Sequence, residues 1–150
     1  MRYVLDTNVM LLLVVGTAKE AWIESHKRTA SRFNSEHYRK LVDIVISPQL
    51  MATTPHILTE VSNLLSQTDE QKRPLILKTF ADLIINVSEI FLPGKDIVDG
   101  NYFYRLGLTD AMILKLKSDD YHLLSVDGPL CYACSVVGLP CTNLTPYFFE

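Results

Sequence analysis

The sequence predicts an α/β fold in which helices cover both sides of a central, mainly parallel sheet of about five strands. Short β-like runs alternate along the chain with longer helical stretches, the order that crossover connections between parallel strands produce. The 150 residues are 48% hydrophobic and 21% charged, an ordinary composition for a folded domain. No repeat and no linker rich in proline or glycine divides the sequence. We therefore expect residues 1–150 to form a single three-layer α/β/α domain.

The first elements follow from strand-forming and capping residues. Residues 2–5 predict the first strand, and three residue types that favour the start of a helix follow it directly, namely Asp6, Thr7 and Asn8. A helix should begin there. Further helical stretches are expected at about 19–33 and 35–46, and Pro48 ends the second of them.

A short strand at 49–53 leads into the next helix. Thr54 is a good N-cap, and Pro55 stands at the first helical position. From there to about Ser66 the apolar residues recur on one face of a helix; they are Ile57, Leu58, Val61, Leu64 and Leu65. This segment is therefore predicted to pack one face against the core.

The second half continues the alternation, although residues 95–107 show no clear pattern. The expected elements are a helix at 74–86, a strand at 89–92, a helix at 109–117, a strand at 122–126, a short helix at 129–138 and an edge strand at 141–144. Together with the earlier segments they give about five strands.

No segment predicts a membrane span, because the apolar run Val9–Val15 has seven residues and a span needs about 20. We interpret the start of the chain as the first strand rather than as a signal peptide. The three cysteines, Cys131, Cys134 and Cys141, are an odd number, which argues against a secreted disulfide framework and favours the cytoplasm. Too few further ligands follow the C-x-x-C for a zinc site, so we expect small core-filling cysteines.

The charge distribution is uneven. A net charge of −3 argues against a strongly basic nucleic-acid coat. Five of the fourteen basic residues nevertheless lie in the segment 27–40; they are Lys27, Arg28, Arg32, Arg39 and Lys40. This segment is either a basic face for a partner or an ordinary solvated surface.

Four acids stand where solvation alone explains them poorly. Asp6 and Asp127 each follow directly on a predicted strand, so both should point from strand ends into one crevice. Glu60 lies on or beside the apolar face of its helix, and Asp110 precedes Ile113 and Leu114 in the same way. Charges at a core margin are costly unless they are paired or bind a metal.

Each acid also has a structural interpretation. Asp6 or Asn8 is suited to cap a helix, Asp110 to sit in a first helical turn, and Asp127 to open a turn. The side chain of Glu60 has a solvent-facing orientation available, in which its carboxylate hydrogen-bonds to water. The joint arrangement, in which each acid lies at the end of a strand or early in the following helix, favours a shared site.

Four short motifs, in this order and across nearly the whole chain, resemble the PIN-domain family. They are Leu5-Asp6-Thr7-Asn8, Thr59-Glu60-Val61, Leu108-Thr109-Asp110-Ala111 and Leu124-Ser125-Val126-Asp127. The resemblance implies a PIN-like nuclease fold, Mg²⁺ or Mn²⁺ as the cofactor, and RNA as the substrate. Many short members are bacterial toxins with an antitoxin partner, and members often form homodimers. Both partners are expectations from the resemblance.

The same resemblance implies roles for individual residues. Asp6, Glu60, Asp110 and Asp127 become the catalytic, metal-binding acids, and three polar residues support them, namely Asn8, Thr109 and Ser125. Ser125 stands where the family often has threonine, and the segment from about Thr17 to Ile46 is longer than in compact toxins.

Phosphodiester hydrolysis explains why acids are needed. A divalent cation supplies an activated water and a positive centre for the phosphoryl oxygens, and Mg²⁺ takes oxygen ligands and waters. We expect Asp6 to anchor the ion, Asp110 and Asp127 to complete its shell, and Glu60 to orient or deprotonate the attacking water.

Other phosphate-handling classes fit less well. An aspartyl-phosphate phosphatase needs a second aspartate at the position of Asn8. A phosphate-receiving signalling domain needs an acceptor aspartate at the end of a middle strand, and no aspartate lies between Asp43 and Asp69. No glycine-rich nucleotide-binding motif occurs. The alternative that stays open is an inactive PIN-like module that binds RNA or a protein.

Overall fold

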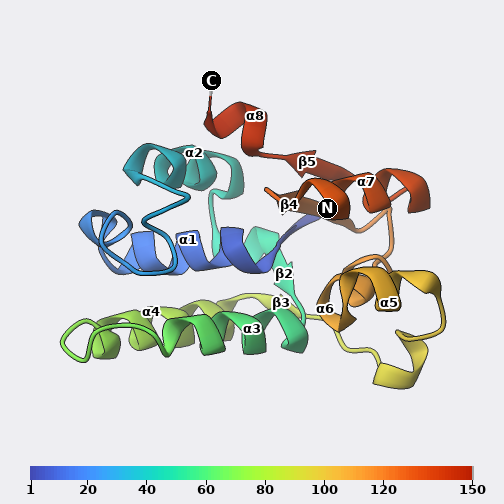
Figure 1. Ribbon diagram of the computed structural model, residues 1–150, viewed down its shortest axis with the longest axis horizontal. Helices are drawn as coiled ribbons and strands as arrows, with labels where there is room; N and C mark the ends of the chain where they lie inside the picture. Colours follow the sequence, from blue (N-terminus) through green and yellow to red (C-terminus); the bar gives the residue numbers. More distant parts are fainter. Residues whose placement is uncertain (150) are drawn as a thin grey trace.

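A five-stranded sheet lies at the centre of the computed structural model, which describes residues 1–149 (Figure 1). The strands are β1 (Arg2–Leu5), β2 (Met51–Thr53), β3 (Ser88–Glu89), β4 (Tyr121–Ser125) and β5 (Cys141–Asn143). Their order is β3-β2-β1-β4-β5, and every neighbouring pair is parallel. Helices flank this sheet, so the predicted three-layer α/β/α fold with a central parallel sheet is confirmed.

Among the described residues, eight α-helices connect and cover the strands (Figure 1). They are α1 (Thr7–Ala18), α2 (Ser35–Val45), α3 (Pro55–Leu65), α4 (Arg73–Asn86), α5 (Asn101–Leu106), α6 (Leu108–Ile113), α7 (Gly128–Val137) and α8 (Thr145–Phe148). Short 3₁₀ turns, η1 (Glu20–Trp22), η2 (Pro48–Leu50) and η3 (Gly94–Asp96), complete the fold. Within the described residues no helix is both long and apolar enough to cross a membrane.

The order of the strands creates a place for a site. The chain leaves β1 to build β2 and β3 on one side and then crosses to build β4 and β5 on the other. Leu5 of β1 lies opposite Leu124 of β4, so Asp6 and Ser125 follow them at the same sheet edge. In open parallel sheets ligands bind beyond the carboxyl ends of the strands, where the strand order reverses.

Helix α1 forms the centre of the core. All residues from Val9 to Gly16 are buried, and α1 contacts α2, α3 and α4. Figure 1 shows α2 and α4 on opposite sides of it. A helix that is apolar all round must be covered on all sides to be stable, which explains why the run Val9–Val15 is the interior of the domain.

The prediction of a helix at 19–33 is wrong. After η1 this segment is a series of separate turns, in which backbone N–H groups of His26, Ala30 and Phe33 donate to carbonyls four residues earlier. Thr29 donates its hydroxyl to the carbonyl of Ile23 (2.6 Å), and the N–H of Arg28 donates to the ring of His26 (3.1 Å). Side chains that bond the local backbone compete with a continuous helix.

Other boundaries differ more modestly. The third strand lies at 88–89 rather than 89–92, and the helix expected at 109–117 runs from Leu108 to Ile113. Helix α5 falls within the unclear segment 95–107, and α8 follows the last strand without having been expected. Both are short, and a stripe of apolar residues is hard to recognise over one or two turns.

Candidate active site

Asp6 ends β1 and caps α1 at the same time. Its Oδ1 accepts a hydrogen bond from the backbone N–H of Val9 (2.9 Å), and its Oδ2 accepts from the hydroxyl of Ser125 and the N–H of Val126 (3.3 Å). The side chain is buried, with 5% exposure. Burial raises the pKa of Asp6, and these hydrogen bonds oppose the rise because they favour the charged form. The carboxylate is therefore fixed in place.

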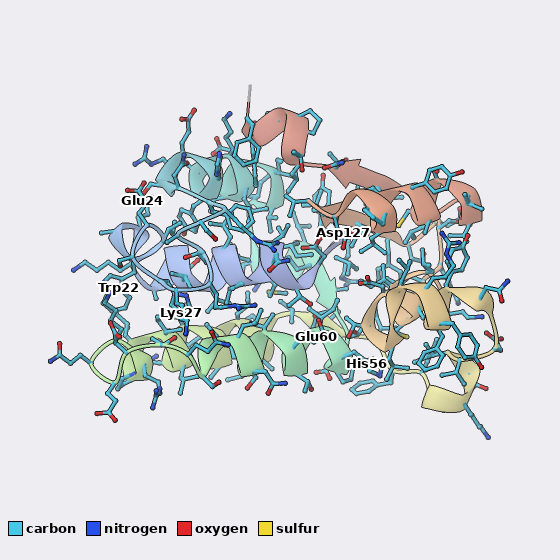
Figure 2. All side chains as sticks on the ribbon, in the orientation of Figure 1. Trp22, Glu24, Lys27, His56, Glu60 and Asp127 are labelled. Atoms are coloured by element: carbon cyan, nitrogen blue, oxygen red, sulfur yellow. The ribbon has the colours of Figure 1, made fainter. Side chains whose placement is uncertain are left out.

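Asp127 follows β4 and caps α7. Its Oδ1 accepts from the backbone N–H of Leu130 (3.0 Å), while its own N–H donates to the hydroxyl oxygen of Ser125 (2.9 Å). Ser125, which is fully buried, thus links the backbone of Asp127 to the carboxylate of Asp6. The side chain of Asp127 is exposed near the start of α7 (Figure 2).

Glu60 is the point where three helices meet. Its two carboxylate oxygens accept hydrogen bonds from Thr7 of α1 (3.0 Å) and from Thr109 of α6, while Glu60 itself lies on α3 (Figure 2). The side chain is exposed, yet these two hydroxyls hold it against its neighbours. Glu60 therefore does not simply lean into solvent.

Asp110 reveals how close the four acids are. It lies in the first turn of α6 and is partly buried. Burial and, in decreasing order, the negative charges of Asp127, Asp6 and Glu60 raise the pKa of Asp110 to about 7. All three carboxylates must lie within electrostatic reach of Asp110 to do so. The structure thus brings together acids from four separate segments of the chain.

Within the described part of the chain, no basic side chain offsets this charge by a direct ion pair. The five ion pairs within residues 1–149 all involve other acids. Like charges held near one another and left unpaired favour a bound cation.

The donors fit a hard divalent cation only in part. They are carboxylate oxygens with hydroxyl oxygens behind them, the ligand type that Mg²⁺ and Mn²⁺ prefer. Among residues 1–149, however, no three Asp, Glu, His or Cys side chains lie close enough together to hold an ion by themselves. Mg²⁺ is usually bound by one or two carboxylates and keeps several waters, so the residues suit that kind of site and not a closed protein cage.

Asn8, the third supporting residue expected from the sequence, lies beside the acids rather than among their hydrogen bonds. It lines a polar cleft of about 340 Å³ together with Glu60 and Thr7. Arg28 and Arg32 of the connection between α1 and α2 line the same cleft, opposite Asn63 and Leu64 of α3. Two members of the basic segment 27–40 are therefore next to the site.

Sequence reasoning missed the role of Thr7 and the position of these arginines. Thr7 stands between two residues that were singled out, and a hydroxyl at the start of a helix was the available signal. The arginines had no local signal, because their position depends on turns that replace the expected helix.

The cysteines pack behind the site. Cys134 is buried on α7, and the sulfur of Cys131 lies 3.2 Å from that of Cys141 on β5. Burial raises the pKa of Cys131 to about 12, with a smaller contribution from Cys141. Such thiols are protonated and serve as packing groups, as the sequence suggested.

Comparisons of the chain with protein-family models, with curated proteins and with solved structures found no match.

Proposed function

We propose that this chain is a metal-dependent ribonuclease of the PIN type, with Asp6, Glu60, Asp110 and Asp127 as its catalytic acids. The observation that supports it is the pKa of Asp110, which burial and then the charges of three other carboxylates from distant parts of the sequence raise to about 7. An acid cluster without a paired base is unfavourable for stability, so its presence at the reversal of strand order favours a functional explanation.

The residues would divide the work as follows. Asp6 and Asp110 would hold Mg²⁺ or Mn²⁺, with Asp127 on the exposed side. When bound, the ion would lower the pKa of a water and offset charge on the phosphoryl oxygens. Glu60, fixed by Thr7 and Thr109, would orient the attacking water and accept its proton at a carboxylate oxygen. Ser125 keeps Asp6 oriented.

The test is RNA hydrolysis by three purified proteins. Wild type is expected to cleave a labelled single-stranded RNA with Mg²⁺ or Mn²⁺ and to stop when the ion is chelated. Asp110→Asn should lose about 100-fold or more of the rate, because a charge that the transition state needs is removed. Asp119→Asn removes an exposed acid before β4 and should leave the rate unchanged. RNA degradation that persists in Asp110→Asn would point to a contaminating nuclease and count against the proposal.

An inactive PIN-like module is the second candidate. It is favoured by the capping roles of Asp6 and Asp127, which explain both residues without catalysis. Retention of all four acids favours the nuclease. Ion-independent RNA binding, without hydrolysis under any ion tested, would favour the module.

The toxin role and the antitoxin partner belong to the same proposal and rest on the sequence resemblance. A small DNA-binding protein encoded next to this reading frame would support them. Co-purification of that protein with this chain is the corresponding measurement, and size-exclusion chromatography with light scattering tests the proposed homodimer.

A further inference from the structure

The cleft beside Glu60 has a second set of residues that the proposed chemistry does not use. One wall is the connection between α1 and α2, which contributes Arg28 and Arg32, and the other is α3, which contributes Asn63 and Leu64. Thr7 and Asn8 of α1 also line the cleft, together with Glu60. A negative site and two positive side chains thus share one cleft of about 340 Å³.

The two arginines differ from their neighbours in the basic segment. Arg39 pairs with Glu20 (3.2 Å) and Lys40 with Glu36 (3.8 Å). Arg28 and Arg32 form no ion pair within residues 1–149, although both are exposed. The acid that shares their cleft, Glu60, already accepts hydrogen bonds from two threonines. Their guanidinium groups are thus available to an anion from outside.

The connection that carries them is anchored. The buried ring of His26 accepts a hydrogen bond from the N–H of Arg28 at Nδ1 (3.1 Å), so its Nε2 carries the proton and donates to Thr68 beyond α3 (2.8 Å). Burial lowers the pKa of His26, and the charges of Lys72 and Arg28 lower it further. Figure 2 shows Lys27 on this connection, with Glu60 on α3. The arginines therefore project from a fixed segment.

We infer that Arg28 and Arg32 bind backbone phosphates of a single nucleic-acid strand next to the bond that the acid cluster hydrolyses. This inference rests on the proposed function. Guanidinium groups bind phosphate oxygens through two parallel hydrogen bonds, and the amides of Asn8 and Asn63 add uncharged donors. Glu60 repels phosphate unless an ion lies between them, so the phosphates of the strand are expected beside the arginines and not beside Glu60.

The experiment measures binding of a fluorescein-labelled 12-nucleotide RNA by anisotropy, in the presence of a chelator so that hydrolysis does not interfere. The variants are Arg28→Gln/Arg32→Gln and, as a control with the same change in charge, Arg39→Gln/Lys78→Gln, which removes two exposed bases already in ion pairs. Melting temperatures should be equal for all three proteins, because the four side chains are exposed.

The Arg28→Gln/Arg32→Gln variant is expected to bind the RNA about 10-fold more weakly. A plot of the logarithm of its binding constant against the logarithm of the salt concentration should be less steep by about 1.4, because each lost phosphate contact with a single strand contributes roughly 0.7. The control should follow the wild type. A DNA strand of the same sequence should show the same difference in slope. Equal slopes for both variants, or a difference confined to RNA, would overturn the phosphate assignment.

The outcome separates this inference from the nuclease proposal. Arginine-dependent binding by a protein that cleaves no RNA would leave the cleft assignment standing and remove the nuclease. RNA cleavage with an unchanged KM in the Arg28→Gln/Arg32→Gln variant would leave the nuclease proposal standing and remove the cleft assignment. Loss of contacts that bind substrate and transition state equally must raise KM at constant kcat.

Discussion

The two ends of helix α1 differ in the kind of contacts they make: polar and charged at one end, mainly apolar at the other. At its N-terminus, Asp6 and Thr7 belong to a network of carboxylates and hydroxyls that joins β4, α3 and α6. At its C-terminus, Gly16 lies against the ring of Tyr38 beside an apolar groove of about 350 Å³ between α1, α2 and α4. One end collects like charges, whereas the other is lined mainly by apolar side chains.

The two ends of α1 therefore affect the free energy of unfolding in different ways. Unpaired acids raise each other's pKa values and resist folding when ionised, whereas close apolar contacts stabilise the fold at every pH. Ions and protons should therefore act at the first end, and changes of side-chain volume at the second. Four predictions test this separation.

The largest effect is expected from divalent ions. Mg²⁺ or Mn²⁺ at a hundredfold excess over its Kd should stabilise the wild type by about 2.7 kcal/mol, or roughly 5–10 °C in melting temperature. Asp110→Asn should lose most of this response, and Asp119→Asn should keep it. Differential scanning fluorimetry measures both. A wild-type melting curve that neither ion shifts would argue strongly against the site.

The next effect lies at the apolar end. A Cβ added at Gly16 would overlap the ring of Tyr38, so the ring or the packing of α1 against α2 must shift. We expect Gly16→Ala to destabilise the protein by about 2 kcal/mol, since overpacking outweighs the better helix propensity of alanine. Urea unfolding measures it.

Two controls sharpen that result. A double-mutant cycle with Tyr38→Leu should give a coupling of about 1 kcal/mol or more, because the smaller side chain removes the clash. Gly16→Ala should also respond to Mg²⁺ as the wild type does. Loss of the ion response in Gly16→Ala would contradict the separation of the two ends.

The third prediction concerns pH. In metal-free protein the pKa of Asp110 is about 7 against 3.8 for the free side chain, so the native state keeps a proton that the unfolded state gives up. The stability it provides is complete below pH 3.8 and is lost as the pH rises to about 7.

Asp110→Asn should therefore be more stable than the wild type at pH 7.5 and lose less stability from pH 5 upward. The difference should be on the order of 1–2 kcal/mol, because partial exposure lets solvent and salt screen the charges. Chemical unfolding at several pH values in a chelator measures it. Parallel stability curves for the two proteins would show that Asp110 is not in a charged cluster.

The smallest effect is expected where α2 ends. Ile46 has φ +64°, and the N–H of Ser47 donates to the carbonyl of Val45 (2.7 Å), which forms a strained γ-turn around a β-branched residue. Its side chain is 74% exposed. Ile46→Gly should therefore stabilise the protein by about 0.5–1 kcal/mol. Ile46→Ala keeps the backbone penalty and should bring no gain in thermal unfolding.

Much of the fold was readable from the sequence because it depends on local patterns. Thr54 and Pro55 mark the start of α3, and the strand residues before Asp6 and Asp127 place both acids at the edge of the sheet. These signals need only a few neighbouring residues. The parallel three-layer arrangement follows from their alternation.

The sequence singled out the four acids, but it did not predict the contacts around them. The hydrogen bonds of Thr7 and Thr109 to Glu60 depend on how three helices meet, and no local pattern encodes that contact. The cleft with Arg28 and Arg32 depends on turns that His26 and Thr29 stabilise with their own side chains, where the pattern suggested a helix. Long-range packing decided both.

The four acids differ in the elements that carry them. Asp6 and Asp127 follow the neighbouring strands β1 and β4 closely and cap the next helices, so moving either would disturb the interior. Asp110 lies on α6, a helix of six residues that begins after Gly107, whose φ is +91°. Any change in the spacing of the four acids should therefore come from α6 rather than from the sheet, within the limits that its buried residues Ala111, Met112 and Ile113 set.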